Sequence, residues 1–160
     1  MNTHILRASI AAAGMLIMFA GVALAQEQED KVQECSIVSL HGSFGYTSTG
    51  TLLDSYAPPP YAGPFAEVGK QIFDGKGNTD GTATLSANGN ISKVTIKGTY
   101  TVNADCTGSM TLNVPALAAI VHVDFVIDDN GTEIRAIVTD ANVVESRIYT
   151  KQCRDGRKDE

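Results

Sequence analysis

The sequence predicts an all-β fold, an eight-stranded antiparallel up-and-down β-barrel, with a β-sandwich as the alternative. From position 35 onward, short runs rich in Val, Ile, Thr, Tyr and Phe alternate with a period of two. Clusters of Gly, Asn and Asp separate these runs at roughly the 8–12-residue spacing of sandwiches and barrels. The connections are short, which favours a meander of neighbouring strands, and closing the meander removes its exposed edges.

The N-terminal segment is expected to lie outside this fold. It carries Arg7, then an apolar or small run over 8–25 that closes on Ala23-Leu24-Ala25 before polar residues. This is the pattern of a secretory signal, so we expect a signal peptide at 1–25, a polar linker at 26–34, one barrel domain at 35–152 and a polar tail at 153–160. An uncleaved membrane anchor is the alternative, since about 18 apolar residues can just span a bilayer.

The charge balance narrows the classes of partner. The formal net charge is −6, and it becomes −7 when Arg7 leaves with the signal. A nucleic-acid partner would require clustered basic residues, so none is expected, and no membrane partner is expected after cleavage. The 135 residues that remain suffice for one domain with its own core.

The first two strands are expected at 37–50 and 66–73, joined by the longest connection of the domain. Segment 52–65 holds four of the five prolines and three aromatic residues, and the prolines favour extended backbone. It is either a solvated excursion or a flap that presents Tyr56, Tyr61 and Phe65 to a ligand at one mouth of the barrel.

The next corner, FDGKGNTDGT at 73–82, has the composition of a metal or phosphate loop but not the spacing. A calcium loop that starts at Asp74 would need an oxygen ligand, a Gly and a Glu where Lys76, Thr79 and Leu85 stand. A dinucleotide loop would need a third Gly at Asp80 and a following helix. We therefore expect a tight corner between strands, in which Gly supplies positive φ and Asn or Asp bonds its own backbone.

Strands at 82–87 and 91–103 are expected to form a hairpin around Asn88-Gly89, which sets Ala83 opposite Val94. Strands at 109–115, 119–128 and 132–139 follow. Taking Asn130-Gly131 as a two-residue turn pairs Ile127 with Ile134, and the pairs of the same apolar face are Phe125 with Ala136 and Val123 with Val138.

The last strand is expected at 143–152. Its corner at 140–142 is predicted to place Val144 beside Val138 and Ile148 beside Ile134, with Glu145 and Arg147 on the exterior. A one-residue slip would turn each set to the other side.

The inward residues predict room for a ligand. Several are small or medium, namely Ala83, Val94, Ala136 and Ser146, and Gly45 and Gly98 thin the wall. Barrels of about eight strands either fill with side chains or hold one small ligand. Tyr46 and Tyr100 are expected as polar groups inside, which with Tyr56, Tyr61 and Phe65 complete the candidate ligand-binding set.

No catalytic set is identified. His122, Asp124 and Arg135 form the densest polar group, but they lie opposite the apolar face and fit an exterior charge ladder better than an acid–base dyad. His41 is isolated, and no histidines have metal-ligand spacing, so we expect no metal centre and no cofactor. Cys35, Cys106 and Cys153 allow three disulfide pairings in an exported chain, and their spacing does not choose among them.

Four stretches carry a resemblance to a known group: CSIVSLHGSFGY, IFDGKGNTDGTATLSANG, IKGTYTVNADCTGSMTL and FVIDDNGTEIRAIVTD. They resemble small exported bacterial proteins thought to be barrels akin to calycins and to the allene oxide cyclase and dirigent barrels. The resemblance implies a bacterial, secreted or periplasmic protein. It also implies pairing of Cys35 with Cys106, which lie in the shared motifs, and leaves Cys153 over. Allene oxide cyclases use a buried carboxylate, and Glu67 is the one carboxylate here in a plausible position.

Three functions follow in order of preference. The first is a secreted barrel that binds a small apolar or aromatic molecule in its lumen without catalysis. The second is a filled structural or envelope-interaction barrel. The third is an isomerase or cyclase similar to the allene oxide cyclase barrels, which an inward ionisable group with a perturbed pKa would favour.

Overall fold

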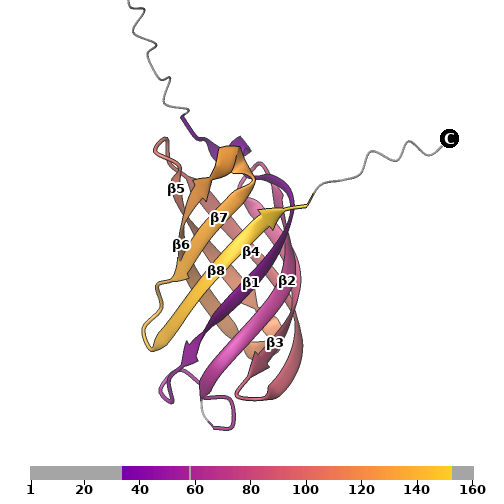
Figure 1. Ribbon diagram of the computed structural model, residues 1–160, viewed down its shortest axis with the longest axis vertical. Coiled ribbons are helices and arrows are strands. Elements are labelled where there is room, and N and C mark those ends of the chain that lie inside the picture. The colour runs from indigo at the N-terminus through magenta and orange to yellow at the C-terminus, as the bar shows by residue number, and fades with distance from the viewer. Residues whose placement is uncertain (1–33, 58, 153–160) are drawn as a thin grey trace, which may run out of the picture. The chain divides into compact units, whose positions relative to one another are not determined.

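The computed structural model describes residues 34–57 and 59–152, and these form a closed barrel of eight antiparallel strands in chain order (Figure 1). This confirms the predicted fold. The predicted signal peptide, the tail, Cys153 and all of the linker except residue 34 lie outside the described residues. The strands are β1 (His41–Leu52), β2 (Gly63–Asp74), β3 (Asn78–Ala87), β4 (Asn90–Val102), β5 (Thr107–Val114), β6 (Ala119–Asp128), β7 (Glu133–Val138) and β8 (Val143–Lys151), with 3-10 turns η1 (Ile37–Ser39), η2 (Pro115–Leu117) and η3 (Asp129–Gly131).

The first strand begins later than expected because residues 37–39 turn back across the barrel as η1. The Ser36 amide donates to Ser39 Oγ at 3.0 Å, and the Ser39 amide donates to the Ser36 carbonyl at 2.8 Å. These two bonds close a tight turn in place of strand pairing, because Ser side chains can satisfy nearby backbone groups.

The corner at 75–77 is a backbone turn, as expected. Asp74 accepts hydrogen bonds from the Lys76 amide at 2.7 Å, the Asn78 amide at 2.9 Å and Asn78 Nδ2 at 2.7 Å. The side-chain and backbone bonds from Asn78, with the Lys76 amide, lower the pKa of Asp74 to about 2. The oxygens that a metal would use are thus occupied by the turn itself.

Both hairpins predicted from Asn-Gly turns are confirmed. Ala83 pairs with Val94 across β3 and β4. Across β6 and β7 the pairs are Val123–Val138, Phe125–Ala136 and Ile127–Ile134, all buried inside the barrel.

The predicted register of β8 is wrong by one residue. Ile134 pairs with Tyr149 and Ala136 pairs with Arg147, so the connection 139–142 takes up one residue more than predicted. Val144 and Ile148 are therefore 65% and 51% exposed, whereas Glu145 and Arg147 face the interior. The same slip turns Ser146 outward.

The end of the barrel that carries η1 and the chain turns 75–77, 103–106 and 129–132 is filled with side chains, and we call it the plugged end. Leu40 is fully buried there, and the Tyr100 hydroxyl donates to its carbonyl at 2.7 Å. Phe73 packs edge-on against Phe44 and Tyr100, with ring centroids 5.4 and 5.2 Å away. Aromatic pairs in this geometry add stability beyond their buried area.

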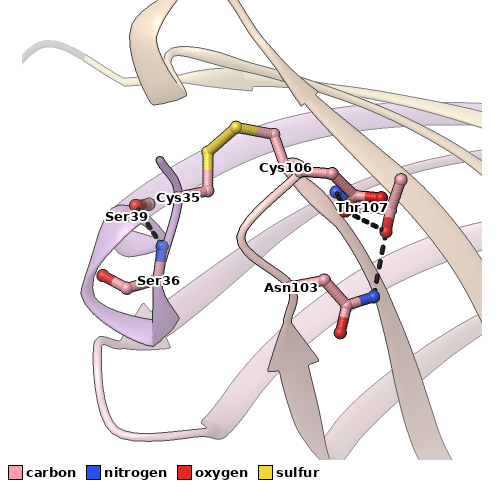
Figure 2. The surroundings of a disulfide bond; sticks show 7 residues. Cys35, Ser36, Ser39, Asn103, Cys106 and Thr107 are labelled. Carbon is pink, nitrogen blue, oxygen red and sulfur yellow. Dashed lines mark hydrogen bonds between the residues drawn. A yellow bond between two sulfur atoms is a disulfide. The ribbon is translucent and has the colours of Figure 1, made fainter. Parts of the chain in front are cut away.

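A disulfide between Cys35 and Cys106 ties the segment before η1 to the β4–β5 turn at this end (Figure 2). The Cys35 amide also donates to the Ala104 carbonyl at 3.0 Å. The predicted pairing is thus confirmed.

Candidate functional site

The opposite end of the barrel, which we call the open end, contains a cavity of about 820 Å³. The connecting segments 53–57, 59–62, 88–89, 115–118 and 139–142 lie at this end (Figure 1). The walls of the cavity are largely apolar, and the apolar residues that form them are Leu85, Ala87, Val94, Ile96, Val114 and Val121. These are the small and medium inward residues of β3 to β6, which leave space where larger side chains would fill it.

The rim of the cavity is formed by the long connection and by η2. Tyr56 and Tyr61 of the connection and Phe65 at the start of β2 contribute from one side, and η2 with Ala118 contributes from the other. The connection is tied down, since Asn88 Nδ2 and Asn90 Nδ2 donate to the Pro60 carbonyl at 3.0 and 3.2 Å. The Leu53 amide also donates to the Asn142 carbonyl at 3.0 Å. The aromatic side chains of the connection are therefore held at the mouth.

The inner end of the cavity is polar, because Glu67, Glu145 and Arg147 line it. We call these three residues the lumen charge cluster. Glu67 accepts a hydrogen bond from the Tyr46 hydroxyl at 2.8 Å through Oε1 and one from the Ser48 hydroxyl at 3.1 Å through Oε2. Burial first, and then the charge of Glu67, raise the pKa of Tyr46 above its usual range, so its hydroxyl stays protonated and donates.

Glu145 and Arg147 form a buried ion pair in which Arg147 Nε donates to Glu145 Oε1. Their side chains are only 6% and 5% exposed. Burial raises the pKa of Glu145, while Arg147 acts in the opposite direction. Burial also disfavours the charged form of Arg147, but Tyr149, Glu145 and Glu67 outweigh it and raise the guanidinium pKa. Arg147 therefore remains a cation inside the barrel.

Several buried polar atoms around this region have no hydrogen-bond partner. They are Arg147 Nη1 and both amide atoms of Gln71. Buried polar groups are nearly always paired with protein or water, and an unpaired one costs free energy. The interior between the cavity and the plugged end is thus built with unused hydrogen-bonding capacity.

The five predicted ligand-binding residues do not all lie together. Tyr56, Tyr61 and Phe65 line the cavity, and Tyr46 lies beneath its inner end as the donor to Glu67. Tyr100 lies at the plugged end, where it bonds the Leu40 carbonyl and does not line the cavity. Both glycines were expected to thin the wall. Gly45 faces outward, because its immediate neighbours Phe44 and Tyr46 face the interior. Gly98 faces inward, because Ile96 and Tyr100, two residues away on either side, face the interior.

Sequence analysis missed Glu145 and Arg147 because it placed them outside. One signal could have pointed to them: the pattern Glu-x-Arg-x-Tyr at 145–149 puts opposite charges two residues apart on one face of a strand, where each can compensate the other. Gln71 gave no such signal, since a single polar residue in an alternating strand fits either face.

The polar group on the exterior behaves as a surface ladder. His122 Nδ1 contacts Asp140 Oδ1 at 2.7 Å, and the His122 amide donates to Asp140 Oδ2 at 2.7 Å. Arg135 is 64% exposed and pairs with Glu133 at 2.8 Å and Asp128 at 3.4 Å. An open hollow of about 710 Å³ lies over β4 to β7 on this side, lined by residues such as Thr101, Asp124 and Arg135.

Neither a metal nor a membrane helix is indicated by the part of the chain that the structure describes. Within residues 34–57 and 59–152, no three His, Cys, Asp or Glu side chains come together in a way that could hold a metal ion. Within the same residues, no helix has the length and apolar character needed to cross a membrane.

Comparison with known proteins supports the fold and does not assign a family. No family model and no curated protein matches the sequence. The redesigned beta barrel b11L5F_LGL is similar in structure, with a TM-score of 0.53 and 18% identity, over 74% of this chain and 96% of that one. EF1p2_mFAP2b, solved bound to DFHBI, has a TM-score of 0.51 and 14% identity, over 71% of this chain and 94% of its own. At these identities the likeness establishes the barrel fold alone.

Proposed function

We propose that this protein is an exported β-barrel that binds a small apolar or aromatic molecule in its lumen. The observation that carries the proposal is the cavity of about 820 Å³ at the open end. Its size lies within the range of roughly 300–1,000 Å³ typical of small-molecule sites, and apolar walls with a few convergent polar groups are the usual lining of such sites. Tyr56, Tyr61 and Phe65 would contact the ligand at the mouth, and Tyr46 would act through Glu67.

Export is supported by two independent features. The N-terminal sequence has the charged, apolar and small-residue parts of a secretory signal. The Cys35–Cys106 disulfide is compatible with an oxidising compartment, where such bonds persist. The resemblance to exported bacterial barrels of the calycin and allene oxide cyclase kind agrees with this placement. That EF1p2_mFAP2b was solved bound to DFHBI indicates that a barrel of this fold can accommodate a small molecule.

A second candidate function, that of an isomerase or cyclase, is favoured by the lumen charge cluster. Glu145 lines the cavity and has a raised pKa, and a carboxyl group that holds its proton at higher pH can serve as a general acid. Binding ranks first because Glu145 is held in an ion pair with Arg147, and Glu67 already accepts hydrogen bonds from Tyr46 and Ser48. A filled structural barrel ranks last, because the cavity leaves room for a guest.

The test is native mass spectrometry of the protein purified from its own host, before and after denaturation. A discrete small mass that is lost on denaturation is the expected result, and it would identify the ligand. The same spectra report cleavage after Ala25 and the state of the three cysteines. A bare mass that gains nothing on exposure to an extract of hydrophobic metabolites would contradict the binding function. A bound molecule that keeps its mass but changes its chromatographic retention or fragmentation spectrum on incubation would favour the isomerase, because isomerisation conserves mass.

A further inference from the structure

The guanidinium of Arg147 has more donors than the structure uses. A guanidinium carries five N–H donors. Nε–H is bonded to Glu145, and Nη1 has no partner although it is buried. Because Arg147 lines the inner end of the cavity, an acceptor at the inner end of a ligand is the group that would complete its bonding.

The charges around Arg147 restrict what that acceptor can be. Glu145 and Glu67 already face the single guanidinium, so the lumen charge cluster holds two carboxylates for one cation. An anionic ligand would add a third negative charge next to two carboxylates, and like charges repel. A cationic ligand would present donors and a positive charge to Arg147, which needs an acceptor.

The position of Arg147 is fixed before any ligand arrives. Glu145 holds Nε from two residues away on the same strand, and the guanidinium carbon lies 5.9 Å from the centre of the Tyr46 ring. The Tyr149 hydroxyl lies beside the guanidinium, and the charge of Arg147 and its hydrogen bond to this hydroxyl oppose the burial that raises the Tyr149 pKa. A preorganised donor of this kind binds an acceptor without further ordering of the side chain.

We propose that Arg147 is the specificity-determining residue of the lumen and binds an uncharged acceptor, a carbonyl oxygen, at the inner end of an apolar ligand. This inference rests on the proposed binding function and adds the chemical class of the ligand. The apolar body of the ligand packs against the apolar walls of the cavity, and its carbonyl oxygen accepts a hydrogen bond from the Arg147 guanidinium.

The experiment uses four naphthalene derivatives of similar shape: 2-acetylnaphthalene, 2-isopropylnaphthalene, 2-naphthoate and 1-(2-naphthyl)ethylammonium. Dissociation constants are measured by calorimetric titration of the purified protein at pH 7. The ketone is expected to bind at least about tenfold more tightly than the hydrocarbon, the effect of one hydrogen bond to a charged group. It is also expected to bind more tightly than both charged compounds.

A double variant links the preference to Arg147. Arg147→Met with Glu145→Gln removes both members of the buried ion pair together, and the half-buried Glu67 keeps its hydrogen bonds from Tyr46 and Ser48. The ketone is expected to lose its advantage, while the affinity of the hydrocarbon changes by less than about threefold. The matched control is Arg135→Met, which removes an arginine that faces outward on the adjacent strand β7 and should leave the ranking unchanged.

The possible outcomes distinguish a failure of the Arg147 proposal from a failure of the proposed binding function. Equal affinity of ketone and hydrocarbon for the wild-type protein would overturn the role of Arg147 and leave lumen binding standing. Tighter binding of the naphthoate or of the ammonium compound would overturn the choice of an uncharged acceptor. Failure of all four compounds to bind would contradict the proposed function itself. These wild-type comparisons decide the question even if the double variant does not fold.

Discussion

The two ends of the barrel share one wall but differ in what fills them. At the plugged end the inward positions hold large side chains, among them Phe44, Phe73 and Tyr100, and a disulfide secures the segment that crosses the end. At the open end the equivalent positions hold Ala87, Val94 and Val121, and the space they leave is the cavity. An eight-stranded barrel is therefore filled or hollow according to side-chain volume at each level.

The two ends of the barrel also differ in the charged side chains that they enclose. Among the described residues, the charged side chains that line the cavity at the open end are Glu67, Glu145 and Arg147. Buried charges generally reduce stability unless they are paired, and they are often kept for a functional reason. The plugged end is filled and cross-linked, whereas the open end keeps a cavity and a buried ion pair.

The largest effect should come from unpairing the charges at the open end. Arg147→Met is expected to lower the free energy of unfolding by about 3–5 kcal/mol, because it leaves the Glu145 carboxylate buried without its partner. Urea denaturation followed by circular dichroism measures this change. The matched Arg135→Met variant should change stability by less than about 1 kcal/mol, since its ion pairs are exposed. Similar losses of unfolding free energy in both variants would show that the Glu145–Arg147 ion pair contributes no more to stability than an exposed pair.

The second largest effect on stability should come from removing the disulfide at the plugged end. Replacing Cys35 and Cys106 together by Ser removes a cross-link between residues 71 apart in the chain, and we expect a loss of about 2–4 kcal/mol in unfolding free energy. The affinity for 2-acetylnaphthalene should stay within about twofold, because the disulfide lies at the end remote from the cavity. Thermal unfolding and calorimetric titration of the same sample give both values. A tenfold loss of affinity would mean that the two ends are coupled.

How far the sequence predicted this molecule depended on the type of turn. Asn88-Gly89 and Asn130-Gly131 are two-residue turns, which dictate the register of their strands, and every pair derived from them is found. The connection 139–142 has no such constraint, and a slip of one residue turned Glu145 and Arg147 from the exterior to the lumen. The charged part of the candidate site was thus missed on a strand whose register no two-residue turn fixes.

The barrel closure itself supplies the missing constraint. Strand β8 pairs with β1 as well as with β7, and the inward Tyr46 lies opposite Tyr149. That pairing joins residues 103 positions apart in the chain, so no local turn signals it. The rim residues, by contrast, were indicated by composition. The prolines and aromatic residues of 52–65 left two alternatives, a solvated excursion or a flap, and Tyr56, Tyr61 and Phe65 line the cavity as the flap alternative expects.

Stability should depend on pH in opposite directions at the two ends. Asp74, at the plugged end, has a folded pKa of about 2 against an ordinary 3.8, so its contribution is present above 3.8 and is lost as the pH falls towards 2. Glu145, at the open end, has a folded pKa raised above 4.5, so the folded state binds the extra proton and loses stability as the pH rises above 4.5.

Melting temperatures between pH 2 and 7 separate the two contributions. Asp74→Asn should remove part of the loss of stability on the acid side, and Glu145→Gln should remove part of the decline above pH 4.5. The comparison is between each variant and the wild type, since Glu67 and other carboxyl groups titrate in the same range. A Glu145→Gln curve parallel to the wild type above pH 4.5 would contradict the opposite signs.

The smallest effect on stability, but a clear one on binding, is expected at the rim. Tyr61 is 45% exposed and lies on a connection, so Tyr61→Ser should change the free energy of unfolding by less than about 0.5 kcal/mol. Because Tyr61 lines the mouth, 2-acetylnaphthalene should dissociate about fivefold faster, the equivalent of about 1 kcal/mol. Stopped-flow fluorescence measures the rate. Ile91→Ser is the control, since Ile91 is 66% exposed and does not line the cavity. Equal rates in the two variants would show that the ligand leaves by another route or that the connection does not cover it.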